Sequence, residues 1–187
     1  VILSAFERGI MSLEVRTRDA TTDSLRRLRH AYGMFPVHDE RVENDPDYFE
    51  HGREKAEDGW LGSAGVWVSD ADDRVVLIRH PKVPDAWGVP GGGHEPDETL
   101  SETAHRQVRE ETGLHCRLTD VLGVRRKEIS TETDSDERIF ALFVLFSGVC
   151  VGGELEVGDS VLDAEWFDSR PDNVLDFIEP QVQRWWW

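Results

Sequence analysis

Residues 90–114 constrain the fold more than any other stretch, because they predict a glycine loop followed by a helix with two defined ends. Thr99 and Glu102 match the capping-box pattern of a helix N-terminus. Gly113 suits the left-handed position that follows a helix C-terminus. We therefore expect a helix over residues 100–112, directly after the loop.

One face of this helix carries the candidate chemistry. Gln107, Glu110 and Glu111 are spaced so that they share that face, and Gly91–Gly93 before the helix let the backbone approach a ligand or a metal. Two adjacent glutamates repel each other unless a cation or an arginine compensates them, and magnesium prefers oxygen ligands. A solvated acidic face is the alternative interpretation in so acidic a chain. The neighbouring apolar stripe, expected to pack on a sheet, consists of Leu100, Ala104 and Val108.

Strand-like segments lie on both sides of the helix, which indicates a layered α/β domain. The loop before the helix is rich in glycine and proline, and a polar linker separates the two longest strand-like segments. The expected strands are residues 64–69, 74–80, 114–129, 138–151 and 161–167; the loop is 81–97 and the linker 130–137; the other helices are 21–32, capped by Thr22 or Asp23, 47–57 and 172–178.

The chain of 187 residues is strongly acidic, with 38 Asp and Glu against 21 Lys and Arg and a net charge of −17. Only three of the bases are lysines, a composition that resembles proteins adapted to molar salt; an ordinary acidic protein is the alternative. Such a charge argues against a duplex nucleic acid as partner. Binding a nucleotide then requires local compensation, which points to a metal.

The chain contains no apolar run near the length of a membrane span, and we expect no membrane partner. The first ten residues lack a basic cluster followed by a long apolar stretch, so no secretory signal is expected. Cys116 and Cys150 lie in strand-like contexts without metal-ligand spacing. Buried, reduced thiols in a cytoplasmic protein are the expectation.

The stretch around the helix resembles the signature of the Nudix (MutT-like) hydrolases, a glycine and a glutamate followed by Arg-Glu-apolar-x-Glu-Glu-x-Gly-apolar. The resemblance implies an α/β fold, a Nudix-type α/β/α sandwich with a mixed central sheet and a loop–helix–loop catalytic motif. It places the hydrolase domain at residues 61–187, with residues 1–60 as an N-terminal helical extension packed on the core. The matching positions are Gly92, Glu98, Arg106, Val108, Glu110, Glu111, Gly113 and Leu114, with Trp87–Gly92 resembling the usual approach to the motif.

The resemblance also implies roles for these residues. Glu110 and Glu111 would bind Mg²⁺ or Mn²⁺, with Gln107 at a ligand position and a backbone carbonyl at Gly92. Glu98 and Arg106 would form an ion pair that orients the carboxylates. The reaction would be hydrolysis of a pyrophosphate bond in a nucleoside diphosphate linked to another moiety. The expected substrate-binding residues are Arg79, Trp87, Gly91, Gly92 and Gly93. A surface ion pair is the alternative for Arg79, and closure of the loop over the core is the alternative for base stacking by Trp87.

One position departs from the family pattern, because Gln107 stands where the family has a glutamate. An amide oxygen can coordinate a metal, but it carries no charge and cannot take a proton. The site then binds fewer metals, recruits another acid, or belongs to a weakened binder. The acids considered for compensation are Glu128, Glu132, Asp134, Asp136, Glu137 and Glu165.

Two other functions compete with hydrolysis. Gln107 keeps open a nucleotide-sensing module with weakened catalysis. An isoprenoid-diphosphate isomerase of the same fold is disfavoured, because those enzymes use a cysteine upstream of the motif and this chain has none before Cys116. ADP-ribose, oxidised nucleoside triphosphates and nucleotide sugars remain open as substrates, and a homodimer is open as well. For the terminal tryptophans, Trp185–Trp187, docking on the domain, a dimer contact and base stacking are the alternatives.

Overall fold

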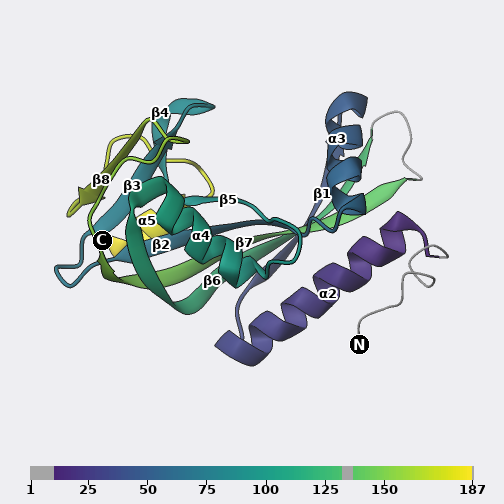
Figure 1. The fold of residues 1–187 in the computed structure, drawn as a ribbon, viewed down its shortest axis with the longest axis horizontal. Coiled ribbons are helices and arrows are strands. Elements are labelled where there is room, and N and C mark those ends of the chain that lie inside the picture. Colours follow the sequence, from purple (N-terminus) through teal and green to yellow (C-terminus); the bar gives the residue numbers. More distant parts are fainter. Residues whose placement is uncertain (1–10, 132–136, 187) are drawn as a thin grey trace. The chain divides into compact units, whose positions relative to one another are not determined.

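The computed structural model describes residues 11–131 and 137–186. Helices and strands are interspersed along the chain (Figure 1). In order they are α2 (Leu13–Tyr32), β1 (Val37–Asn44), α3 (Pro46–Glu57), β2 (Gly62–Ser69), β3 (Val75–His80), β4 (Val83–Gly88), β5 (Gly91–Gly93), α4 (Leu100–Thr112), β6 (Leu114–Thr131), β7 (Arg138–Gly153), β8 (Asp163–Phe167) and α5 (Glu179–Trp185).

The described strands join in one mixed sheet. Its order is β1-β6-β7-β2-β3-β4, while β5 pairs with β2 and β8 pairs with β3. Strand β1 runs parallel to β6, and β3 runs antiparallel to β2, β4 and β8. The expectation of an α/β fold with a mixed sheet is therefore confirmed.

The chain divides into two compact units. The first comprises Val1–Ser63, Gly93–Leu100 and Val121–Val144, and the second comprises Ala64–Gly92, Ser101–Asp120 and Leu145–Trp187. Helices α2 and α3 and strand β1 belong to the first unit, and α4, β3, β4, β8 and α5 belong almost entirely to the second.

Helix α2 of the first unit is longer than the sequence predicts. It begins at Leu13 with Ser12 as its N-cap, so the expected cap at Thr22 or Asp23 is wrong. The Thr22 hydroxyl instead donates a hydrogen bond of 2.8 Å to the Arg18 carbonyl one turn earlier. A threonine that bonds back along its own helix sits in the helix interior, although its side chain equally suits a cap.

Strand β1 is absent from the sequence prediction. Its sequence is mostly polar, and Val37 and Val42 are its only apolar residues. It forms because it pairs in parallel with β6, from Val37 opposite Val124 to Asn44 opposite Thr131. Helix α3 follows nearly as predicted, with Asp45 capping it, and packs on a cluster of buried residues that comprises Phe49, Ala56, Ile129, Ile139 and Ala141.

In the second unit, β2 and β3 form the buried centre, and Trp67 on β2 is 0% exposed. The rings of Trp185 and Trp186 contact Trp67 edge-on, with centroids 6.0 and 5.6 Å away, and Trp185 Nε1 donates to the Asp73 carbonyl at 3.1 Å. These two tryptophans thus dock on the buried core, while Trp187 lies outside the described residues. The predicted helix at 172–178 is wrong, because the terminal helix is α5.

The predicted loop at 81–97 is also partly wrong, since it contains β4 and β5. Strand β4 lies at the end of the sheet order and pairs with β3, with Trp87 opposite Arg79. An edge strand tolerates proline, and Pro84 falls on β4, so composition alone suggested a loop. Within the described residues, no helix is both long and apolar enough to cross a membrane.

Candidate metal and phosphate site

Helix α4 has the bounds that the sequence predicts, Leu100 to Thr112. Its apolar stripe is fully buried, with Leu100 at 1% exposure and Ala104 and Val108 at 0%. Gly113 follows with φ +69° and donates its N–H to the Arg109 carbonyl at 3.0 Å. Burial of one face fixes which way the charged face of the helix points.

Glu111 is the one acid of this helix that is buried, at 3% exposure. Its Oε2 accepts a hydrogen bond of 2.8 Å from the Gly91 backbone N–H. Burial raises the pKa of Glu111 to about 7, the Gly91 hydrogen bond opposes this effect, and the charge of Glu110 adds to it. A carboxylate held in such an environment favours a nearby cation.

The glycine strand β5 lies directly against Glu111 and Gln107 of α4. A Cβ atom at Gly91 would be 2.6 Å from the Ala64 carbonyl oxygen, and one at Gly92 would be 2.6 Å from Cδ and Oε1 of Gln107. Only glycine therefore fits at Gly91, where the obstacle is backbone. The glycines let the loop approach α4 itself, so the Gln107 amide and the Glu111 carboxylate both meet its backbone.

Glu110 and Arg106 form a half-exposed pair one turn apart. Arg106 Nη1 donates to Glu110 Oε2 at 3.2 Å, and the Glu110 side chain is 50% exposed. Glu98 belongs to the first unit and Arg106 to the second, and the ion pair between them stays a prediction. Glu110 is thus accessible where Glu111 is not.

His94, which is 6% exposed, holds the loop before α4 in place through two hydrogen bonds. His94 Nδ1 accepts the Leu61 N–H at 3.3 Å, so Nε2 carries the proton and donates to the Glu98 carbonyl at 2.6 Å. This residue therefore fills the loop and positions the backbone of Glu98. Gly93 lies nearby, and a Cβ there would be 4.0 Å from Trp60 Nε1.

Arg79 and Trp87 are brought together on β3 and β4. The guanidinium of Arg79 lies 4.8 Å from the centroid of the Trp87 ring and forms an ion pair with Asp163. Trp87 also meets Phe167 edge-on at 4.7 Å. Arg79 Nε is buried with no hydrogen-bond partner among the described residues. Sequence reasoning singled out Arg79 and Trp87 separately, and strand pairing supplies the contact between them.

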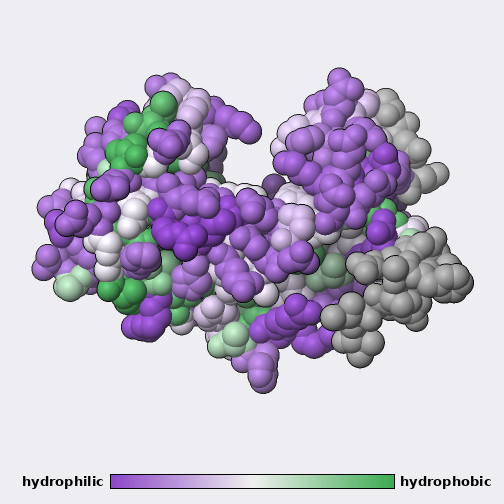
Figure 2. Space-filling model, in the orientation of Figure 1, coloured by the Kyte–Doolittle hydropathy of each residue, from purple (hydrophilic) through white to green (hydrophobic). Residues whose placement is uncertain are grey.

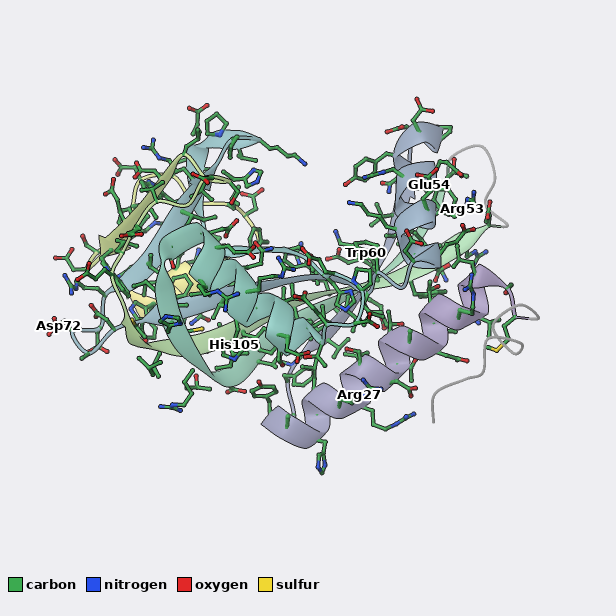
Figure 3. The ribbon with its side chains drawn as sticks, viewed as in Figure 1. Arg27, Arg53, Glu54, Trp60, Asp72 and His105 are labelled. Carbon is green, nitrogen blue, oxygen red and sulfur yellow. The ribbon has the colours of Figure 1, made fainter. Side chains whose placement is uncertain are left out.

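His105 and the acids considered for compensation complete the set of candidate side chains. His105 is exposed on α4 (Figure 3), and its Nδ1 lies 3.7 Å from the buried Cys116 Sγ. Arg138 Nη1 donates a hydrogen bond of 2.8 Å to Oε1 of Glu128. Glu165 is exposed on β8. Glu137 is exposed just before β7, and Glu132, Asp134 and Asp136 lie outside the described residues.

The donor atoms on α4 suit a hard cation, although they are few. Over residues 11–131 and 137–186, no group of three or more His, Cys, Asp or Glu side chains is arranged to hold a metal ion. Two carboxylates, Glu110 and Glu111, together with the Gln107 amide and the backbone of Gly92, nevertheless offer only oxygen ligands. Oxygen ligands and a desolvated carboxylate fit magnesium or manganese.

Comparisons with known proteins identify the family of the chain. The sequence profile of the NUDIX domain matches residues 60–171. The ADP-ribose pyrophosphatase of Methanocaldococcus jannaschii is 33% identical over 103 residues, 54% of this chain and 58% of that protein, so the chain spans less than two thirds of this relative. The nucleoside triphosphatase NudI of Escherichia coli K12 is 30% identical over 111 residues, 57% of this chain and 73% of that protein.

Solved structures point the same way for the fold. The crystal structure of a NUDIX hydrolase from Nitrosomonas europaea matches with a TM-score of 0.51 and 20% identity, over 67% of this chain and 70% of that one. This likeness bears on the fold alone, and it confirms the expected α/β fold of Nudix type. Because the NUDIX domain profile covers more than half of the residues, the chain belongs to the NUDIX domain family.

Proposed function

We propose that the chain hydrolyses a pyrophosphate bond in a nucleoside diphosphate linked to another moiety, with Mg²⁺ or Mn²⁺ as cofactor. One observation carries the proposal. The buried carboxylate of Glu111 receives the Gly91 N–H at 2.8 Å, and burial raises its pKa to about 7. Such a carboxylate gains most from a divalent cation, which restores its charged form.

The cation would be held by Glu110 and Glu111, with the Gln107 amide and the Gly92 carbonyl as weaker ligands. When bound, a divalent cation lowers the pKa of a water molecule and neutralises phosphate charge. Glu98 and Arg106 would orient the carboxylates. The glycine backbone at 91–93 would approach the substrate.

Arg79 and Trp87 would contact the substrate from β3 and β4. The Arg79 side chain is 38% exposed, which supports a phosphate contact, because a guanidinium group can bind phosphate beside an ion pair. Arg79 lies 4.8 Å from the Trp87 ring centroid, so a base would have to stack on the opposite ring face or displace it. A phosphate at Arg79 is therefore the better supported contact of the two.

Gln107 cannot serve as a base, so a proton acceptor must come from elsewhere. Glu165 is exposed within the second unit, which also contains α4. Glu128 and Glu137 belong to the first unit, and Glu128 is already engaged by Arg138. Glu165→Gln and Glu137→Gln variants would identify the acceptor by loss of turnover with retained metal binding.

The names of the relatives support two substrate classes for the proposed reaction. One matched protein is named for ADP-ribose and the other for nucleoside triphosphates. A test is to incubate the protein with ADP-ribose, nucleoside triphosphates and nucleotide sugars in molar potassium chloride with Mg²⁺ or Mn²⁺. Metal-dependent release of phosphate products from one class supports the proposal. Folded protein that binds but cleaves none of them contradicts it.

A sensing module with weakened catalysis is the second candidate, and Gln107 favours it. Gln107→Glu restores the family residue and should raise turnover about tenfold or more if the site is a weakened enzyme. The matched control is Gln183→Glu on α5, which places the same change at an exposed position away from α4. No basal activity and no gain in Gln107→Glu would favour the sensing module.

Salt adaptation and a cytoplasmic setting are part of the same proposal. The net charge of −17 supports them, and the face of the molecule in Figure 2 is mainly hydrophilic. Carboxylate-rich surfaces repel themselves at low salt, and screening relieves this. Activity that rises from 0.1 M to 2 M potassium chloride would support the adaptation, and activity that falls would contradict it. A homodimer stays an expectation of the resemblance.

A further inference from the structure

A groove in the first unit gathers arginines that the proposed reaction does not use. It consists of two adjoining cavities of about 460 and 540 Å³, which share Thr22, Asp39 and Arg126. Cavities of this size are typical of small-molecule sites. We call it the arginine groove, after Arg18, Arg26 and Arg29 on α2, Arg41 on β1 and Arg126 on β6.

More basic than acidic side chains line the groove, whereas the chain as a whole is acidic. Five of the 21 basic residues line it, in a chain with a net charge of −17. Three acids, Asp39, Glu40 and Glu128, accompany them. The lining of the groove is therefore net positive in an otherwise acidic protein. Glu14 and Asp23 pair with Arg18 and Arg26, so Arg29 and Arg126 are the arginines that favour a small anion.

Two of the arginines keep donors available for a ligand. Arg126 donates from Nε to Asp39 at 2.5 Å, which lowers the pKa of Asp39, and its terminal nitrogens have no partner among the described residues. Arg29 lies 6.0 Å from the Phe35 ring centroid and pairs with no carboxylate in the described part of the chain. An exposed ion pair contributes little stability, so Arg126 can also bind a phosphate.

The two cavities differ in chemistry. The smaller one has Arg26, Arg29 and Arg126 against a single acid, Asp39. The larger one adds the carboxylate of Glu128, whereas the carboxylate of Glu40, which also lines it, pairs with Arg125 on the other face of the strand. Guanidinium groups bind phosphate through paired hydrogen bonds, whereas carboxylates accept hydrogen bonds from hydroxyl and amino groups. A ligand with a phosphate at one end and hydroxyls at the other matches both cavities.

We propose that the arginine groove binds a phosphorylated sugar, either free or as part of a nucleotide. Its phosphate lies between Arg29 and Arg126, and its hydroxyl or amino groups face Glu128. An extended polyanion does not fit, because the rest of the acidic surface repels it. None of the residues that line the groove belongs to α4, and the proposal stands whether or not the chain hydrolyses pyrophosphates.

The test is calorimetric titration of the full chain with ribose 5-phosphate, adenosine monophosphate and inorganic phosphate. EDTA is present, so that metal-dependent binding contributes nothing. Saturable binding of ribose 5-phosphate and the nucleotide at equal strength indicates a sugar phosphate, and tighter binding of the nucleotide indicates a nucleotide ligand. Inorganic phosphate binding as tightly as both overturns the proposal, as does no binding of any of the three.

Each wall of the groove offers a matched pair of variants. On the strand, Arg126→Gln should weaken binding about tenfold or more, whereas Arg125→Gln on the opposite face should leave it unchanged. On the helix, Arg29→Gln should weaken binding similarly, whereas Arg27→Gln should not, since Arg27 is exposed and lines neither cavity (Figure 3).

Thermal unfolding checks that each variant is folded. The exposed Arg29→Gln change on α2 keeps the test decisive if Arg126→Gln does not fold. Equal losses within each pair would overturn the proposal, because a general effect of charge would then explain the binding.

Discussion

Helices α4 and α2 handle charge in opposite ways. Helix α4 buries Glu111 to 3% exposure and leaves it one hydrogen bond, from Gly91. Helix α2 keeps four of its five arginines exposed and pairs two of these with acids on the same helix, Arg18 with Glu14 and Arg26 with Asp23. An exposed charge is compensated by a neighbour one turn away at small cost, whereas a buried charge shifts its pKa. The contrast predicts a cation at α4 and an anion beside α2.

Removing the buried charge tests the α4 side with the largest expected effect. Glu111→Gln should lower the rate of pyrophosphate hydrolysis on the order of a thousandfold, because the cation loses its most desolvated ligand. Hydrolysis and Mn²⁺ binding are measured together. Glu54→Gln on α3, an exposed glutamate labelled in Figure 3, is the control and should change neither quantity. Full activity in Glu111→Gln would remove this residue from the site.

The stability of the metal-free protein should also depend on Glu111. A pKa raised from 4.5 to about 7 means that the folded state holds this proton more tightly than the unfolded state. Protonated Glu111 therefore stabilises the folded state below pH 4.5. As the pH rises to about 7, this contribution to the free energy of unfolding, roughly 3 kcal/mol, is lost.

Denaturant unfolding of wild type and Glu111→Gln in EDTA measures this effect. The difference between them isolates one residue from the other titrating acids. The variant should be the more stable protein at pH 8, and Mg²⁺ should reduce its advantage. A variant that is less stable at pH 8 would contradict the assignment of a raised pKa.

The C-terminal ends of the two helices form a matched pair of lower expected effect. Gly113 after α4 and Gly33 after α2 have φ of +69° and +80°, and each donates its N–H to the carbonyl four residues earlier. A Cβ at Gly113 would lie 2.6 Å from the Glu154 carbonyl oxygen, whereas nothing lies within 4 Å at Gly33. Gly33→Ala should cost about 1 kcal/mol and Gly113→Ala about 2–3 kcal/mol. Equal losses in thermal unfolding would mean that backbone strain alone matters.

Local signals explain why α4 was predicted to its last residue. Thr99, Glu102 and Gly113 all lie within four residues of an end of the helix, so its bounds are written in the adjacent sequence. Strand β1 has no such signal, because it forms by pairing with β6, more than eighty residues later. The proline and glycine residues around β4 predicted a loop, whereas pairing with β3 makes this segment a strand.

The residues of the candidate site could be predicted from the sequence, but the contacts between them could not. The spacing of Gln107, Glu110 and Glu111 put them on one helix face, yet which acid is buried depends on how β5 meets α4. The arginine groove was not predicted at all. It joins Arg18 and Arg126, which lie far apart in the sequence, and only the packing of α2 beside β1 and β6 reveals it.

The start of α2 allows the finest test of the comparison, because two substitutions should act with opposite signs. Ser12 caps the helix, so Ser12→Ala should cost about 1 kcal/mol. Thr22 lies inside the helix with its hydroxyl on the Arg18 carbonyl, so Thr22→Ala should be neutral or stabilise by up to about 0.5 kcal/mol. Thermal unfolding of both variants decides the point. If the helix instead began at Thr22, Thr22→Ala would be the damaging change, and Arg18 would leave the helical wall of the arginine groove.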